Sequence, residues 1–386
     1  MAANVTLFPD LISDSEKDYF AGLGILPSQA MRELVREQAI SADTPIDDDQ
    51  IQPASLDLRL GDVAYRVQTS FIPGAGSNVE RKIAQLAMHK VDLSQGAVLE
   101  KGCVYIAPLQ ETLSLRKGIS GTANPKSTTG RLDIFTRLIT DYATEFEVVP
   151  SGYKGRLYLE ISPRTFSVLV RAGDRLNQLR LRRGAERHTD ISIARLQDKE
   201  PLVFLPGEAA AKPNIAKGLW LSIDLIGAHG SDLIGYRAKK HTPLIDLRKL
   251  RHYEPEDFWE PIQRSKTAGL ILNPDDFYIL VSKERVSIPP DFAAEMVPYD
   301  PSVGEFRIHY AGFFDPGFGY GESRAGTPAV LEVRSHEVPF LVEDGQIVGR
   351  LVFEKLAEPP ERIYGSGIGS NYAAQGLALS KQFKPA

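Results

Sequence analysis

The chain of 386 residues contains a single cysteine, Cys103. An intramolecular disulfide is therefore excluded, and so is a zinc site of the Cys-x-x-Cys type, which needs paired thiolates. His252 and Glu254 form a His-x-Glu pair, but the Pro-Cys-x-x-Cys element that would complete such a zinc centre is absent. We expect a protein of a reducing compartment that uses no zinc.

Long apolar runs and a strong charge bias are also missing. No apolar segment approaches the roughly 18 residues of a membrane-spanning helix, and residues 1–5 lack the basic and apolar regions of a signal peptide. The net charge of −5 is unlike that of a general nucleic-acid binder, although residues 180–183 are locally basic. We therefore expect a cytoplasmic protein that binds neither nucleic acid nor membrane. Walker-type loops and dinucleotide fingerprints are absent as well.

Glycine and proline are abundant, with 32 and 26 residues, and they separate short segments rich in Val, Ile, Leu, Tyr and Phe. This pattern is typical of a β-rich sandwich or barrel, so we predict a mainly β fold with few short helices. One helix is expected from about Ser28 to Ile40, with Ser28 as its N-cap. The predicted strands are 56–60, 104–108, 155–162, 176–181, 277–282, 307–310, 329–334 and 347–353.

The sequence contains one pattern twice, with a constant offset of 173 residues over its longest part. The matched segments are 96–120 with 269–293, 157–161 with 329–333, and 55–58 with 222–225. Such an internal repeat indicates two domains of one fold. We predict a first domain at 1–190, a linker at 191–218, a second domain at 219–358 and a C-terminal tail at 359–386.

The two copies differ at positions suited to polar ligands. The first copy has the run Lys126-Ser127-Thr128-Thr129-Gly130-Arg131, whose hydroxyls, backbone N–H groups and cations could surround phosphate oxygens, while the aligned residues 299–304 cannot. The second copy has Asp315 in an Asp-Pro-Gly-Phe turn before the strand of Glu332, where residues 150–153 of the first copy offer no aspartate. The simplest interpretation is one composite site built from both copies.

Each of these features also has a plain structural explanation. A Ser/Thr-rich turn with flanking cations is commonly a solvated loop. Glu160 and Glu332, at equivalent strand positions, could point into solvent, or a carboxylate held in a cleft could act as a general base. Tyr364, Tyr372 and Gln375 lie in a glycine-containing tail that could be a disordered end or could close over a bound nucleotide.

Together the motifs resemble the bacterial dCTP deaminase family, a branch of the trimeric dUTPase-like β fold. The resemblance is carried by Gln52-Pro53-Ala54-Ser55-Leu56-Asp57-Leu58-Arg59-Leu60-Gly61, by residues 126–132 and 155–160, and in the second copy by 315–318, 330–332, Tyr364, Tyr372 and Gln375. It implies two tandem dUTPase-like domains of the β-clip, distorted jelly-roll type, as in the long form of the enzyme. Family sites lie between neighbouring subunits, so a homo-oligomer is also expected.

The resemblance implies a site with contributions from both copies and the tail. The first copy would supply Ser127 and Arg131 at the reacting water and phosphates, with Lys126, Thr128 and Gln178 holding the triphosphate. The second copy would supply Asp315 for the deoxyribose hydroxyl, the Ala311 backbone for the cytosine edge and Glu332 as the base. The closing tail would supply Tyr364, Tyr372 and Gln375.

The implied reaction is hydrolytic deamination of dCTP to dUTP and ammonia, which feeds the synthesis of dUMP and dTTP. Glu332 would deprotonate a water held by Ser127, and the water would attack C4 of cytosine. Arg131 would orient Glu332 and balance the charge that develops. Mg²⁺ would enter with the triphosphate rather than on protein ligands, so the chemistry at the base would be metal-free.

The sequence also departs from the family pattern. Ala311-Gly312-Phe313-Phe314 replaces an Ala-His-Arg element, Asn371 replaces a lysine, and Glu160 is kept in the first copy as an alternative base. The other functions considered are a dUTPase, a bifunctional dCTP deaminase and dUTP diphosphatase, and a nucleotide-binding module without catalysis. Release of ammonia and of pyrophosphate would distinguish these possibilities.

Overall fold

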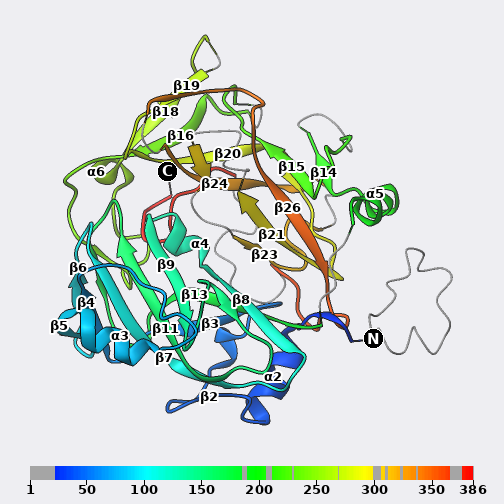
Figure 1. The fold of residues 1–386 in the computed structure, drawn as a ribbon. Coiled ribbons are helices and arrows are strands. Elements are labelled where there is room, and N and C mark those ends of the chain that lie inside the picture. The colour runs from blue at the N-terminus through cyan, green and yellow to red at the C-terminus, as the bar shows by residue number, and fades with distance from the viewer. Residues whose placement is uncertain are drawn as a thin grey trace, which may run out of the picture.

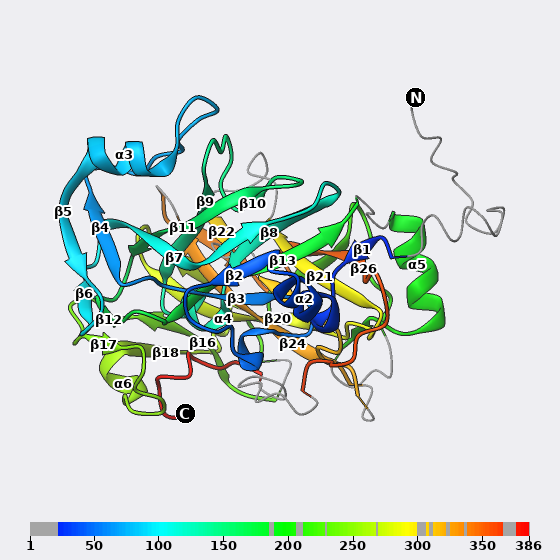
Figure 2. The same cartoon turned by 90° about the horizontal axis from the view of Figure 1, so that it is seen from below.

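The computed structural model describes residues 22–184, 189–205, 211–227, 230–267, 269–298, 306–308, 312–321, 325–335, 338–365 and 376–385. Within these ranges the chain is mainly β, and the two copies of the repeat form two β units that lie side by side (Figure 1). The prediction of a mainly β protein with few short helices is confirmed. Helices α3 and α5 lie at opposite ends of the molecule (Figure 2).

The first unit consists of two larger sheets and shares a third, small sheet with the second unit. One sheet has the order β1 (Gly24–Ile25), β13 (Arg175–Arg183), β8 (Ile119–Pro125) and β10 (Val148–Val149), with β3 (Leu56–Arg59) paired to β13. The next has the order β5 (Ala87–Asp92), β4 (Val63–Val67), β7 (Val104–Ser114), β11 (Lys154–Pro163) and β9 (Ile134–Thr140), with β2 (Ile40–Ala42) on β7. The shared sheet has the order β17 (Ile245–Asp246), β12 (Val168–Val170) and β6 (Ala97–Leu99).

The second unit repeats this arrangement. Its largest sheet has the order β18 (Trp259–Gln263), β16 (Leu233–Ala238), β20 (Phe277–Val286), β24 (Thr327–Ser335) and β22 (Phe306–Ile308), with β14 (Val203–Phe204) on β20. The facing sheet has the order β15 (Leu219–Ser222), β26 (Ile347–Lys355), β21 (Phe292–Pro298) and β23 (Phe313–Phe314). A third sheet pairs β19 (Gly269–Leu272) with β25 (Phe340–Glu343).

Strand register shows that the units are equivalent residue by residue. β7 and β11 correspond to β20 and β24, and Glu160 lies opposite Ile106 just as Glu332 lies opposite Ile279. The two glutamates therefore occupy the same place in the two units. This register agrees with the sequence match of 157–161 with 329–333.

The proposed match of residues 55–58 with 222–225 is wrong by four residues. Leu56 lies opposite Leu179 on β13, whereas the equivalent position on β26 lies opposite Leu219. Hydrogen bonds support this correction, because Glu111 accepts from the backbone of Arg59 and Glu284 accepts from the backbone of Ser222. The short similarity between these two segments does not determine the register, which is set by pairing with the neighbouring strand.

The helices of the described residues are α2 (Ser28–Arg36), the 3-10 turn η2 (Asp48–Gln50), α3 (Val79–Leu86), α4 (Ser127–Gly130), α5 (Asp190–Lys199) and α6 (Pro255–Phe258). Helix α2 begins where predicted, but Pro27 is its N-cap and Ser28 is the first helical residue. It also ends earlier than Ile40, because Gln38 has a φ of 59°, which the right-handed helix cannot accommodate. Ile40 instead begins β2, which pairs with β7.

The two largest apolar cores stabilise the units, and an aromatic cluster joins the units. Trp259 of the second unit is 1% exposed and packs edge-on against Phe166 of the first, with ring centroids 5.4 Å apart. Phe383 near the C-terminus packs on the same tryptophan at 6.0 Å. Burial of rings of this size is a main source of stability, so the two units and residues 376–385 form one packed structure.

The segment predicted to be a linker is built into the second unit. It carries α5 and β14, β14 pairs with β20, and Ile193 of α5 belongs to the apolar core of that unit. The predicted tail, 359–386, is likewise packed where it is described, at residues 359–365 and 376–385. Arg251 N–H donates to Lys381 O at 2.9 Å, and Lys384 N–H donates to Tyr253 O at 2.9 Å.

Candidate active site

The predicted phosphate loop leaves the end of β8 as one tight turn. Thr129 N–H and Gly130 N–H donate to Lys126 O at 2.8 and 2.9 Å, which forms the single turn of α4. Ser127 is exposed on this turn, whereas Arg131, the residue that ends the helix, is buried. The turn therefore presents a hydroxyl to solvent and directs a guanidinium into the protein.

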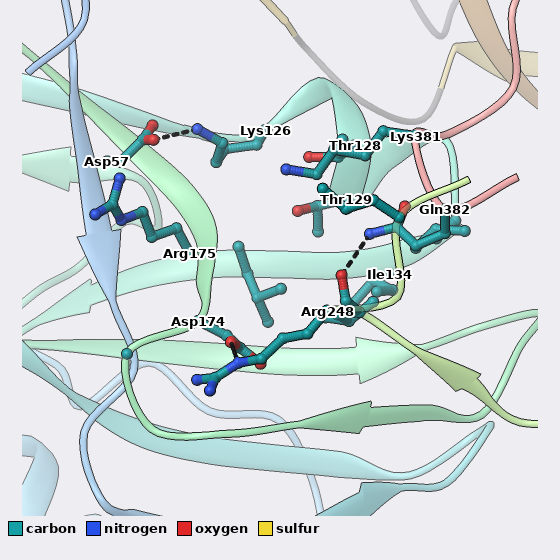
Figure 3. A pocket seen from close by; sticks show the side chains of 15 residues that line it. Asp57, Lys126, Thr128, Thr129, Ile134, Asp174, Arg175, Arg248, Lys381 and Gln382 are labelled. Atoms are coloured by element: carbon teal, nitrogen blue, oxygen red, sulfur yellow. Dashed lines mark hydrogen bonds and ion pairs between the residues drawn. The ribbon is translucent and has the colours of Figure 1, made fainter. Parts of the chain in front are cut away.

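A cavity of about 360 Å³ lies against this loop. Its polar lining includes Asp57, Lys126, Thr128, Arg175, Arg248 and Lys381. Figure 3 shows Lys126 beside Asp57 on one side, Lys381 and Gln382 on another, and Arg248 beside Asp174 below. The first unit, the second unit and the C-terminal segment all contribute to this cavity.

The charge of this cavity favours an anion. Lys126 forms an ion pair with Asp57, and Arg248 donates to Asp174 Oδ1 at 2.7 Å. Burial lowers the pKa of Lys381, and the positive charge of Lys126 lowers it further. A bound phosphate chain would reduce this repulsion between cations, so the cavity suits a polyanionic ligand.

The C-terminal segment covers the phosphate loop directly. Ser380 Oγ donates to Thr128 O at 2.9 Å, and Arg131 Nη1 donates to Ala378 O at 2.8 Å. Gln382 Nε2 donates to Leu247 O at 2.9 Å, which ties the segment to the second unit. These contacts fix Lys381 at the edge of the cavity.

Glu332 lies on β24 of the second unit and is buried, with 7% of its surface exposed. Burial raises the pKa of Glu332 to about 7, the charge of Arg131 opposes this rise, and Asp133 adds to it. The carboxyl thus lies within electrostatic reach of two residues of the first unit. A carboxyl group that titrates near neutral pH is suited to taking up and releasing a proton.

Asp315 lies in the turn after β23 and contacts the first unit through Arg180. Arg180 Nη2 lies 3.1 Å from Asp315 Oδ1, and Arg180 Nη1 donates to Ala294 O at 2.9 Å. The Arg180 guanidinium also lies over the ring of Phe313, 4.0 Å from its centroid. Burial raises the pKa of Asp315, and the charge of Arg180 opposes the rise. An arginine from the first unit thus stands beside the hairpin that lacks the family's own basic residue.

Tyr364 is the one predicted tail residue that the structure describes. Its N–H donates to Pro316 O at 2.7 Å, and its ring packs on Phe318 with centroids 5.4 Å apart. Tyr364 therefore sits on the hairpin of Asp315. Ala311, Tyr372 and Gln375 lie outside the described residues.

Glu160, the alternative base, is buried in the first unit and is 1% exposed. Arg137 donates to its Oε1 through Nε at 2.9 Å and through Nη2 at 2.5 Å. The same guanidinium lies 3.6 Å from the centroid of the Phe146 ring. The carboxylate of Glu160 is thus neutralised by a residue of its own unit, away from the phosphate loop.

The remaining predicted residue, Gln178, lies on β13 beside the loop. Its Nε2 donates to Pro125 O at 3.4 Å, and its Oε1 accepts from Ser55 Oγ at 3.4 Å. The structure thus places Lys126, Thr128 and Gln178 near one another, and Arg131 near Glu332. Neither Glu332 nor Asp315 lines the 360 Å³ cavity, so it represents only the phosphate side of the candidate site.

Sequence reasoning missed several polar residues around the loop. They are Arg175, Arg248 and Lys381 at the cavity, and Asp133 and Arg334 beside Glu332. Asp57 could have been singled out, because it lies in the run 52–61 that carried the family resemblance. The others come from distant segments and have no local motif, so only the tertiary structure reveals them.

Comparison with known proteins agrees with this geometry. The model of the 2'-deoxycytidine 5'-triphosphate deaminase N-terminal domain matches residues 22–185, and that of its C-terminal domain matches residues 189–383. The chain belongs to the dCTP deaminase family. The predictions of tandem dUTPase-like domains and of a dCTP-deaminating enzyme are thereby confirmed at the level of the family.

Individual dCTP deaminases are similar to this chain in sequence and in structure. A crystal structure of 2'-deoxycytidine 5'-triphosphate deaminase from Agrobacterium tumefaciens is 55% identical, with a TM-score of 0.82 over 86% of this chain and 99% of that one. A dCTP deaminase, dUMP-forming, from Kocuria rhizophila is 27% identical over 50% of this chain and 88% of its own length. A dCTP deaminase from Natronomonas pharaonis is 35% identical over 32% of this chain and 60% of its own length. The shorter relatives match about one repeat.

Two further structural features concern metal binding and membranes. Among the described residues, no group of three or more His, Cys, Asp or Glu side chains is arranged to hold a metal ion. In the same part of the chain, no helix is long and apolar enough to cross a membrane.

Proposed function

We propose that this member of the family hydrolyses dCTP to dUTP and ammonia at one composite site, with Glu332 as the general base. The observation that carries the proposal is the juxtaposition of Glu332 of the second unit with Arg131 of the phosphate loop. Neither unit supplies both groups. The complementary losses seen in the sequence are expected if only this pairing of loop and hairpin is used.

The triphosphate would lie in the cavity beside the loop. Lys126 and Lys381 would bind its oxygens from opposite segments, and Thr128 and Gln178 would donate hydrogen bonds. The deoxyribose hydroxyl would donate to Asp315, which Arg180 holds in place. The Ala311 backbone would recognise the cytosine edge, and Tyr364, Tyr372 and Gln375 would close over the nucleotide.

The chemical step requires proton transfer at C4, N3 and the amino group of cytosine. Ionised Glu332 would take a proton from a water held by Ser127, and the oxygen would bond to C4 to give a tetrahedral intermediate. The carboxyl would give this proton to N3, then take the proton of the new C4 hydroxyl and pass it to the amine, so that the C4–N4 bond breaks, C4=O forms and ammonia leaves. Arg131 would stay cationic and stabilise the charge on Glu332 as the proton moves.

Mg²⁺ would enter with the triphosphate and keep most of its waters. Asp57 is suited to contact the hydrated ion, because it lines the cavity and its buried Oδ1 accepts no hydrogen bond from the described residues. A magnesium-bound water could donate to this oxygen. The ion would shield the phosphate charges, while the deamination would be carried out by side chains alone.

The test is release of ammonia and pyrophosphate from dCTP with Mg²⁺ by wild type, Glu332→Gln and Glu160→Gln. We expect ammonia without pyrophosphate from wild type, its loss in Glu332→Gln, and its retention in Glu160→Gln. Ammonia from Glu332→Gln would refute the assignment of the base. Some relatives are named dUMP-forming, and pyrophosphate in the wild-type reaction would show that this chain also cleaves the triphosphate.

The remaining expectations are part of the proposal. We propose that the enzyme acts in the cytoplasm as a homo-oligomer and binds neither nucleic acid nor membrane. Sedimentation of the purified chain at several concentrations would measure its oligomeric state.

A further inference from the structure

A buried ion pair crosses between the two units next to Glu332. Arg334 Nη2 forms an ion pair with Asp133 Oδ2 and donates to Thr165 Oγ1 at 2.9 Å. Thr165 Oγ1 in turn donates to Asp133 Oδ2 at 2.5 Å, and Arg334 Nη1 donates to Asp275 O at 2.8 Å. Asp133 is fully buried and Arg334 is 6% exposed.

Each residue of this pair lies two positions after a residue of the proposed active site. Arg334 lies two residues after Glu332 on β24, so both side chains project from the same face of the strand. Asp133 lies two residues after Arg131 at the end of the phosphate loop. The two short segments therefore face each other with alternating charges, cation then anion in one and anion then cation in the other.

The backbone at Asp133 supports a specific placement. Its φ of 53° is in the left-handed region, which Asp and Asn tolerate better than most residues. Its N–H donates to Gly130 O at 2.8 Å, and its carbonyl accepts from Arg164 N–H at 2.9 Å. This conformation turns the chain directly after Arg131 and directs the Asp133 carboxylate toward Arg334.

We propose that Asp133 and Arg334 form a positioning pair, which holds the strand of Glu332 against the loop of Arg131 and sets the charge around the catalytic carboxyl. The inference rests on the proposed role of Glu332 as the base. A buried ion pair contributes little to stability compared with apolar packing of the same volume. Its value here lies in geometry, because a base displaced by about 1 Å can lose on the order of a hundredfold in rate.

Electrostatics provide independent support. The charged groups that act on Glu332 are Arg131, which lowers its pKa, and Asp133, which raises it. Arg334 holds the Asp133 carboxylate in an ion pair and so offsets part of its effect. Removing Asp133 or Arg334 should therefore displace the titration of Glu332 in opposite directions, although both changes break the same contact.

The experiment measures kcat, KM and the pH dependence of kcat/KM for Asp133→Asn, Arg334→Met and the double variant. Asn keeps the left-handed backbone and the shape of the side chain. We expect the acidic limb to move to lower pH in Asp133→Asn and to higher pH in Arg334→Met, by about half a unit to one unit each. We expect kcat to fall roughly tenfold or more in both single variants, with a smaller change in KM, and the limb of the double variant to lie between theirs.

The matched control is Arg171→Met, which breaks another ion pair between the units. Arg171 binds Asp246 through two hydrogen bonds of 2.7 and 2.9 Å, and neither residue is among the groups that shift Glu332. This variant should leave the acidic limb in place. If Arg334→Met does not fold, as judged by its thermal transition, Arg334→Lys replaces it with the same expected direction and a smaller shift.

Three outcomes separate the possible failures. Limbs that move together, or that stay at the wild-type position, would overturn the positioning pair. An acidic limb that shifts equally in Arg171→Met would also overturn it, since any contact between the units would then suffice. Ammonia release by Glu332→Gln would instead refute the proposed function on which the inference rests.

Discussion

Replacement of Glu332 by glutamine should abolish activity and yet stabilise the protein at alkaline pH. In the folded protein the pKa of Glu332 is raised from 4.5 to about 7, chiefly by burial. As pH rises through this interval, the unfolded chain loses the proton first, so the folded state becomes less stable relative to it. The shift corresponds to roughly 3 kcal/mol that is lost by pH 8. Glutamine has no charge to bury and avoids this loss.

The assay compares urea unfolding midpoints of wild type and Glu332→Gln at pH 5 and pH 8. We expect the variant to gain stability relative to wild type between these pH values, by up to about 3 kcal/mol. In parallel, kcat/KM of wild type should fall about tenfold from its plateau to pH 6, where roughly one tenth of a base with this pKa is ionised.

Glu160→Gln is the matched control for this prediction. It removes an equally buried carboxyl at the equivalent strand position, but one that Arg137 binds through two hydrogen bonds. This variant should lose stability at both pH values, because Arg137 is left without its buried partner. The reasoning would be refuted if Glu332→Gln were no more stable relative to wild type at pH 8 than at pH 5, or if the acidic limb of kcat/KM lay near pH 4.5.

Three further predictions concern the cavity, the partner of Asp315 and the aromatic cluster between the units. Lys381→Met should raise KM for dCTP by about tenfold through loss of a phosphate contact, and Lys384→Met in the same segment should not; steady-state kinetics of both variants decide this. Arg180→Met leaves Asp315 buried without its cation and should cost about 3–5 kcal/mol of stability, measured by thermal unfolding; an unchanged midpoint would contradict it. Phe383→Ala should cost a similar amount by opening a cavity in the aromatic cluster and should raise KM, whereas a change in KM alone would show that the C-terminal segment is not a stabilising element.

The repeat explains why much of the fold could be predicted from the sequence. The shared pattern over residues 96–120 and 269–293 indicated which strands correspond, and the separate match of 157–161 with 329–333 gave the correct register of Glu160 and Glu332. Short segments were less informative, because the four-residue similarity of 55–58 with 222–225 is too short to determine which strand positions correspond. The end of α2 was also missed, because the left-handed conformation of Gln38 has no distinct sequence signal.

The candidate site was predictable where one segment carries the whole feature. The loop 126–131 and the turn at Asp315 are local motifs, so each can be recognised in the sequence without knowledge of the tertiary structure. Lys381, Arg248 and Arg334 belong to the site only because the second unit and the tail pack on the first. No spacing in the sequence encodes such contacts, which depend on the packing of Trp259 and Phe383 between the units.

The two equivalent glutamates show how environment assigns a role to an identical residue. Glu160 faces Arg137 within its own unit, so its charge is satisfied without any contribution from the second unit. Glu332 faces Arg131 and Asp133 across the interface, so its titration depends on how the two units are joined. Duplication supplied two carboxyls in the same strand position. Arg137 turned one of them into part of a structural ion pair, and burial at the interface gave the other a pKa suited to proton transfer.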